Sequence, residues 1–173
     1  MRRSQLTFGL AVTLTFLLAA CADDRISPTS PGGVPAVSTA SSWGPETPHF
    51  NLEVILRGEG FGHVKFRQPN DDDFIVYLDT WVRGLAPNTS YLLERAVDTT
   101  IDNNCTSTTW LTLGAGPAAL AITTDERGTG RAELWRQVPP TAGAEFDIHF
   151  RVINELTSAV VLTSECYQYK VSL

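Results

Sequence analysis

The side chains that could ligate a metal ion or carry acid–base chemistry are few in this sequence. His49, His63 and His149 are the full set of 3 histidines, and three imidazoles can hold a zinc or copper ion when a fold brings them together. They share no spacing and lie among polar neighbours, so we expect three separate surface histidines. A metal-dependent enzyme would require at least two of them to converge.

Carboxylates are more numerous, and their densest run is Asp71-Asp72-Asp73. Calcium prefers several oxygen ligands, but consecutive carboxylates point in different directions and the alternate-residue spacing of a calcium loop is absent. We interpret the run as a solvated turn. No Gly-x-Ser-x-Gly motif occurs. Cleavage of a glycoside needs two carboxylates at a set distance from each other, and sequence spacing does not show which two would lie that close. The candidates are Glu53, Glu59, Asp79, Glu94, Asp98 and Asp102. We predict a non-catalytic protein without a metal or another cofactor.

Tryptophans could form a platform for a sugar or a peptide. Trp81 lies in a run that is apolar at both alternating positions, so we expect it in the core. Trp110 and Trp135 have polar neighbours, and both core packing and ligand binding remain open for them. A net charge of -6, with no basic run after Arg3, argues against a nucleic-acid partner.

The first residues have the pattern of an export signal. Arg2 and Arg3 precede an apolar run over 6–20, which as a helix would span only about 22 Å against a hydrocarbon core of about 30 Å. A secretory signal peptide over 1–20 fits better than a spanning helix. The following Leu18-Ala19-Ala20-Cys21 resembles the lipobox of bacterial lipoproteins. That resemblance implies diacylglycerol on the Cys21 thiol and an acylated amine, and Ala22 after it implies sorting to the outer membrane.

Residues 21–47 are rich in Pro, Ser, Thr and Gly, a composition that cannot bury enough apolar surface to fold. We interpret them as the lipidated cysteine followed by a flexible tether, with the folded domain over 48–173. If Cys21 carries lipid, two of the 3 cysteines remain in an exported chain. We therefore predict a Cys105–Cys166 disulfide, with two free thiols as the alternative.

From Pro48 onward the apolar residues alternate with polar ones in short runs, which Gly, Pro, Asn and Asp separate. This period of two predicts about nine or ten strands and an antiparallel β-sandwich. Two of the runs, 74–82 and 159–163, are apolar on both faces and are predicted to be central. The predicted strands cover 50–57, 63–67, 74–82, 91–97, 110–113, 119–124, 131–138, 146–153, 159–163 and 166–171.

One short motif resembles a known family. Leu85-Ala-Pro87-Asn-Thr89-Ser-Tyr91 is similar to the Leu-x-Pro-x-Thr-x-Tyr corner of fibronectin type III domains, whose Tyr hydroxyl bonds back to the chain. The resemblance implies an immunoglobulin-like sandwich with a structural corner at Tyr91. Some eighty residues follow Tyr91, more than that family has, so the resemblance extends to the sandwich class and not to strict membership.

Two functional hypotheses follow. The first is a lipid-anchored structural or interaction module of the cell envelope, at the outer membrane, whose partners are the membrane and an unknown envelope protein or glycan. The second is a carbohydrate- or peptide-binding lipoprotein that uses Trp110 and Trp135. Exposed, adjacent tryptophans would favour the binder, and buried ones would favour the structural module.

Overall fold

The computed structural model describes residues 51–172. The predicted signal peptide, Cys21, the tether and His49 lie outside the described residues. Within 51–172 the chain forms 12 strands and no helix, which confirms the all-β class. Accordingly, no helix long and apolar enough to cross a membrane occurs in this range.

Eight strands are long enough to build layers: β1 (Asn51–Gly58), β2 (Phe61–Arg67), β3 (Ile75–Arg83), β4 (Ser90–Asp98), β9 (Gly130–Gln137), β10 (Glu145–Asn154), β11 (Val160–Ser164) and β12 (Tyr167–Lys170). Four are only two residues long: β5 (Leu111–Thr112), β6 (Gly114–Ala115), β7 (Ala118–Ala119) and β8 (Ile122–Thr123). The long strands match the predicted runs closely at both ends. The predicted runs 110–113 and 119–124 are instead broken into short pieces.

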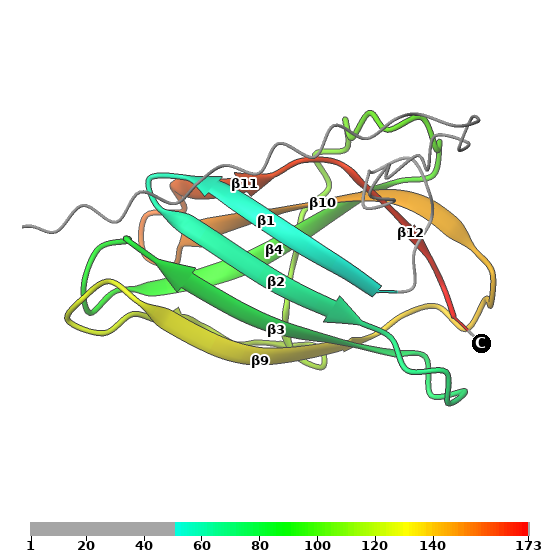
Figure 1. Cartoon of the computed structure of the whole chain (residues 1–173), viewed down its shortest axis with the longest axis horizontal. Helices are drawn as coiled ribbons and strands as arrows, with labels where there is room; N and C mark the ends of the chain where they lie inside the picture. Colours follow the sequence, from blue (N-terminus) through cyan, green and yellow to red (C-terminus); the bar gives the residue numbers. More distant parts are fainter. Residues whose placement is uncertain (1–50, 173) are drawn as a thin grey trace, which may run out of the picture. The chain divides into compact units, whose positions relative to one another are not determined.

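The strands join into one sheet in the order β5-β4-β10-β11-β1-β2-β3-β9-β6-β7. Figure 1 shows β1, β2, β3 and β9 side by side in front, with β4 and β10 behind them. Because β11 pairs with both β10 and β1, it joins the two layers along one side. On the other side β8 pairs with β4, and a Thr124–Gly130 bridge leads into β9. The sheet therefore comes close to closing into a barrel.

The pairing is antiparallel except between β6 and β9, which are parallel. The sheet is thus mixed, and the immunoglobulin-like sandwich stays a prediction. Strands β3 and β11 do have neighbours on both sides, as expected for central strands.

The core follows from the alternation along each strand. Inward residues of both layers form one cluster, which includes Val54, Val64, Leu78, Leu93 and Phe150. On β3 the residues between the inward ones are partly or well exposed. The 74–82 run is therefore central in the sheet, as predicted, but only one of its two faces is buried.

The 85–91 segment forms a tight corner before β4. Tyr91 is 2% exposed, and its hydroxyl accepts a hydrogen bond from the Ala86 backbone N–H at 3.1 Å. The Thr89 hydroxyl donates to the Pro87 carbonyl at 2.8 Å, and buried Leu85 donates its N–H to Gly128. This is the arrangement that the resemblance to the fibronectin corner implies, and it fixes where β4 begins.

Candidate ligand-binding groove

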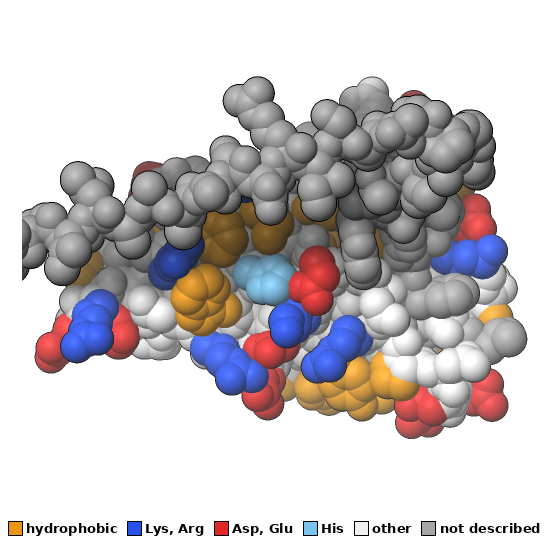
Figure 2. Space-filling view, in the orientation of Figure 1, with side chains coloured by type: hydrophobic (Ala, Val, Ile, Leu, Met, Phe, Trp, Pro, Cys, Tyr) orange, Lys and Arg blue, Asp and Glu red, His pale blue; other side chains and the backbone are white. Residues whose placement is uncertain are grey.

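The outer face of the front layer, formed by β1, β2, β3 and β9, carries aromatic and charged side chains. Figure 2 shows this face, where lysines and arginines lie among carboxylates and apolar groups. Its outward cationic residues are Arg57, Lys65, Arg67, Arg83 and Arg131, and its acidic ones are Glu53, Asp79 and Glu133. The face is therefore more basic than the chain as a whole, whose net charge is -6.

Strand register places two exposed aromatic side chains next to each other on this face. Tyr77 on β3 is directly opposite Trp135 on β9 and Arg67 on β2. Tyr77 is 45% exposed and Trp135 is 38% exposed. Such large apolar surfaces in neighbouring positions are typical of binding sites more than of a face that only meets water.

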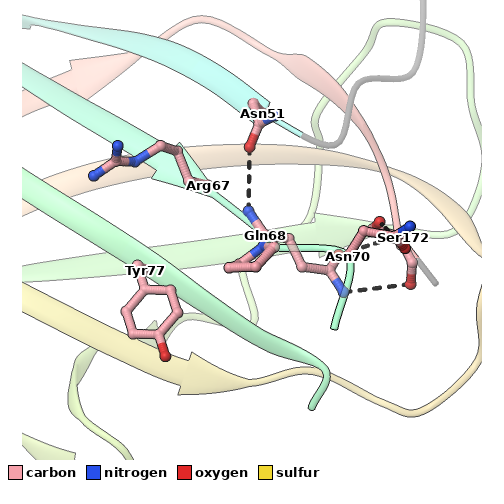
Figure 3. Close-up of a pocket in the computed structure, with 7 residues that line it drawn as sticks. Asn51, Arg67, Gln68, Asn70, Tyr77 and Ser172 are labelled. Carbon is pink, nitrogen blue, oxygen red and sulfur yellow. Dashed lines mark hydrogen bonds between the residues drawn. The ribbon is translucent and has the colours of Figure 1, made fainter. Parts of the chain in front are cut away.

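A hollow of about 530 Å³ lies beside Tyr77, within the range of small-molecule sites. Figure 3 shows Arg67 and Tyr77 on one side of this first hollow and Asn70 with Ser172 on the other. The wall consists of Asn51, Arg67, Gln68, Pro69, Asn70, Tyr77 and Ser172.

Gln68 forms the floor of the first hollow, and most of its hydrogen-bonding groups have partners within the protein. Its Oε1 accepts hydrogen bonds from the Ser172 N–H at 2.8 Å and from the Tyr169 hydroxyl, while Nε2 donates to the Ser172 carbonyl at 3.4 Å. Its backbone N–H donates to Asn51 Oδ1 at 3.3 Å. Buried Gln68 thereby ties the end of β2 to the segment after β12.

Other polar groups of the first hollow remain open. Among the described residues, the Arg67 guanidinium and the Tyr77 hydroxyl have no hydrogen-bond or ion-pair partner, and neither do the side-chain amide nitrogens of Asn51 and Asn70. The hollow therefore presents one cation, two amide donors and one hydroxyl around an aromatic ring.

A second hollow of about 220 Å³ continues from the first and shares Arg67 and Tyr77 with it. Here the charges are paired, because Arg131 donates from Nε and Nη2 to the two carboxylate oxygens of Asp79 at 2.9 and 3.1 Å. Nη2 also reaches Glu133 Oε1 at 3.2 Å. The hydrogen bond to Asp79 raises the pKa of Arg131. We call the two hollows together the Tyr77 groove.

Beyond the groove, the same face holds a stacked group of arginine and aromatic side chains. The Arg83 guanidinium lies 4.9 Å from the Phe61 ring centre and 5.3 Å from that of Trp81, and the two rings meet edge to face at 6.1 Å. Trp81 is thus half-buried on the outer face, so the expectation that it belongs to the core is wrong. His63, beside it on β2, bonds to Glu53.

The Trp135 ring is seated on Gly116. The Gly116 N–H donates to the Trp135 carbonyl at 2.9 Å, and a Cβ at Gly116 would lie 2.7 Å from Cη2 of the indole. Gly116 also has a φ of +70°, which favours glycine. The turn after β6 therefore sets the position of the Trp135 ring.

Trp110 lies in a different environment, against the outer side of β10. Its ring stacks on His149 at 4.6 Å between centres, and the Arg151 guanidinium lies 4.0 Å from the ring centre. Arg151 Nε also pairs with Glu94 Oε2 at 2.6 Å, and Glu94 Oε1 accepts from the Thr112 hydroxyl at 3.2 Å. Each of these side chains has a partner within the protein.

Trp110 and Trp135 are therefore not partners in one platform. No aromatic ring pair among the described residues joins them. Tyr77 is the aromatic neighbour of Trp135 instead. The sequence reasoning missed Tyr77, although its place between inward-facing Val76 and Leu78 is the signal that could have identified it as outward.

The loop that carries Trp110 is held at its start by the predicted disulfide, with the Sγ atoms of Cys105 and Cys166 at 2.06 Å. The loop is also held by Asp147, whose Oδ2 accepts from the backbone N–H groups of Asp102 and Asn103 at 3.0 and 2.8 Å. This loop is thus joined to β10 and to the segment before β12.

The histidines and the aspartate run that were considered as metal ligands do not form a metal site among the described residues. Within 51–172, no group of three or more His, Cys, Asp or Glu side chains is placed to hold a metal ion. His63 and His149 lie on β2 and β10 with separate partners. Asp71, Asp72 and Asp73 form an exposed turn, in which Asp71 Oδ1 accepts from the Asp73 N–H at 3.3 Å.

No protein-family model matches this chain, and no curated protein matches it at a significant level. An exposed ring, open amide donors and an unpaired guanidinium can bind a ligand that has a flat apolar face, hydroxyl groups and a negative charge.

Proposed function

We propose that this protein is a lipid-anchored, non-catalytic binding module of the bacterial cell envelope that recognises an acidic glycan in the Tyr77 groove. The observation that carries the proposal is the exposed Tyr77 ring between two hollows, next to an arginine without an ion-pair partner among the described residues. The proposal combines the two hypotheses drawn from the sequence, the envelope interaction module and the glycan-binding lipoprotein. The aromatic residues proposed to bind the glycan are Tyr77 and Trp135 in place of Trp110 and Trp135.

The aromatic side chains supply the surface for a sugar ring. A pyranose has one face made of C–H groups, which can lie flat on an aromatic ring while its hydroxyls point sideways toward hydrogen-bond donors and acceptors. Tyr77 and Trp135 are cross-strand neighbours on the outer face, so they can contact successive sugar units along one chain.

The two hollows differ in charge, and this difference favours an acidic sugar in the first hollow. Among the described residues of that wall, Arg67 is the one charged side chain, and a guanidinium binds a carboxylate through two parallel hydrogen bonds. In the second hollow Arg131 is already paired with Asp79 and Glu133. A uronic acid in the first hollow and a less charged sugar unit in the second would match the charge of each hollow.

The anchor part of the proposal is supported by the sequence alone. Leu18-Ala19-Ala20-Cys21 resembles a lipobox, and the Pro- and Ser-rich 22–47 segment supplies a tether between Cys21 and the β-domain. The corner at Tyr91 supports an immunoglobulin-like class for that domain. An acidic chain is not drawn to anionic lipid headgroups, so the acyl chains would hold the protein at the outer membrane.

Binding is tested by isothermal titration calorimetry of the detergent-solubilised protein with tetragalacturonate and with neutral cellotetraose. We expect tetragalacturonate to bind at least tenfold more tightly than cellotetraose, and added salt to weaken it. Arg67→Gln should remove this preference, and Tyr77→Ala should weaken both ligands.

The matched control is Arg127→Gln in the exposed turn after β8, which should bind as the wild type does. Equal affinities of the wild type for the two tetrasaccharides would contradict the acidic-glycan proposal. A failure of both to bind at millimolar concentration would contradict the glycan class altogether.

The anchor is tested by Cys21→Ser. We expect this variant to leave the membrane fraction and to lose incorporation of labelled palmitate, because no acyl chain can then be attached. Sedimentation of the variant with membranes at the wild-type level would refute the lipid anchor.

A further inference from the structure

Two arginines occupy positions of their strands that face the interior. On β4, Arg95 follows the alternation of the buried residues Tyr91 and Leu93. On β9, Arg136 follows the alternation of Ala132 and Leu134, which are also buried. Apolar residues fill most such positions elsewhere in the core, so a pair of guanidinium groups here requires an explanation.

Both arginines are half-buried and line one small cavity of the β-domain. The rest of its wall is largely apolar, with contributions from Phe66, Leu113 and Ile148. The centre of a water-sized sphere can move over about 30 Å³ there, whereas one bound water needs roughly 10–15 Å³ by the same measure. The cavity therefore has room for one or two waters or a small ion and not for an acyl chain.

The two charges have no acidic counterpart among the described residues. Neither Arg95 nor Arg136 takes part in an ion pair with residues 51–172. Within the same range, the two guanidinium groups make one hydrogen bond, a long one of 3.5 Å from Arg136 Nη1 to the Gly116 carbonyl. Burial, and then the charge of Arg136, lower the pKa of Arg95. A guanidinium stays protonated in proteins, so the fold bears the repulsion unless an anion compensates it.

We propose that this cavity is a binding site for a small monovalent anion, either a halide or the carboxylate group of a short organic acid, held between Arg95 and Arg136. The ion would accept hydrogen bonds from both guanidinium groups and remove their mutual repulsion. Arg95 and Arg136 face inward, while the Tyr77 groove is on the outer face. The two sites are therefore separate, and this site does not depend on glycan binding.

Thermal unfolding of the full-length protein tests the proposal. Sodium chloride, bromide or acetate is increased at constant ionic strength, with the bulky gluconate ion as the balance. A ligand that binds only the folded state raises the melting temperature, and we expect a saturable rise of about 3 °C in at least one of the three salts. A response to halides alone would assign the site to a halide, and a response to acetate alone would assign it to a carboxylate.

The variants Arg95→Met and Arg136→Met should lose this rise, and each should melt at or above the wild-type temperature in gluconate, because the repulsion between two half-buried charges is gone. Arg127→Met, which removes an exposed arginine, should keep the rise. If Arg95→Met fails to fold, the salt-dependent rise in melting temperature is compared between Arg136→Met and the wild type alone. Anomalous scattering from a bromide-soaked crystal should show a peak between the two guanidinium groups. Equal melting temperatures in all salts, with bromide peaks only at the surface, would overturn the proposal.

Discussion

Two regions of this molecule contain the same kinds of side chain, aromatic rings with arginines and carboxylates, but differ in how these side chains are partnered. On the outer side of β10, Trp110 lies between His149 and Arg151, and Arg151 is paired with Glu94. On the outer side of β3 and β9, Trp135 and Tyr77 lie near arginines and carboxylates as well. In the Trp110 region the ring, His149, Arg151 and Glu94 contact one another, whereas in the Tyr77 groove Arg67 and the Tyr77 hydroxyl have no hydrogen-bond or ion-pair partner among the described residues.

Solvent exposure separates the two regions further. The Arg151–Glu94 pair has side chains only 25% and 10% exposed, while the Arg131–Asp79 pair has values of 59% and 29%. An ion pair shielded from water is costly to break by removing one partner, and an exposed pair contributes little. The Trp110 region therefore stabilises the fold, whereas the groove is accessible to a ligand.

The largest effect on stability is expected from the disulfide. Replacing Cys105 and Cys166 together by Ala frees a loop closed over a sequence separation of 61 residues, which should lower the free energy of unfolding by roughly 4 kcal/mol. Urea denaturation measures this change. Glycan affinity below the new transition should stay the same, and a tenfold loss of affinity would break the separation of the two regions.

Trp110→Ala should have the next largest effect. It removes the ring between His149 and Arg151 and should cost about 2 kcal/mol of unfolding free energy, since a half-buried ring loses less than a core ring. Trp135→Ala should cost less than about 1 kcal/mol, as expected for an exposed side chain, and should weaken glycan binding instead. The opposite ranking in urea denaturation would reverse our assignment of the two tryptophans.

Gly116→Ala should disturb the groove through its backbone. The new Cβ would meet the Trp135 ring at 2.7 Å, at a φ of +70°, so we expect a loss of about 1–2 kcal/mol and a displaced indole. Glycan affinity should fall with it, while the near-ultraviolet signal of Trp110 stays unchanged. Ala115→Gly, at an exposed neighbouring position, is the control and should leave Trp135 in place.

Tyr169→Phe should have a small effect at neutral pH, about 1 kcal/mol for one lost hydrogen bond to Gln68. Burial raises the pKa of Tyr169 well above its usual value of 10.0. The unfolded chain therefore releases this proton near pH 10 while the folded chain keeps it, so the stability that this group contributes is fully present below pH 10 and is lost above it. Unfolding measured from pH 8 to 11.5 should show a weaker alkaline loss in the variant than in the wild type.

Much of the fold could be predicted from the sequence, because period-two alternation, turn residues and cysteine pairing are local or countable signals. The strand runs, the disulfide and the all-β class follow from them. The groove could not be predicted, because alternation says which residues share a face of one strand and not which strands are neighbours. Tyr77 and Trp135 meet only through the β3–β9 pairing.

One wrong prediction and one omission have a physical origin. Trp81 belongs to an apolar run, yet its ring is stabilised outside the core by Phe61 and Arg83, so hydrophobicity alone placed it wrongly. Arg95 and Arg136 occupy inward positions that a pattern of apolar residues does not reveal. Both cases depend on charged side chains whose neighbours come from other strands.

Nuclear magnetic resonance of the indole N–H groups tests the central claim most directly. The chain has 4 tryptophans, and single Trp→Phe variants assign their signals. On titration with tetragalacturonate we predict that the Trp135 signal shifts in a saturable way while the Trp110 signal stays in place. A shift confined to Trp110, or no shift in either signal at saturating ligand, would contradict the assignment of the Tyr77 groove as the binding site.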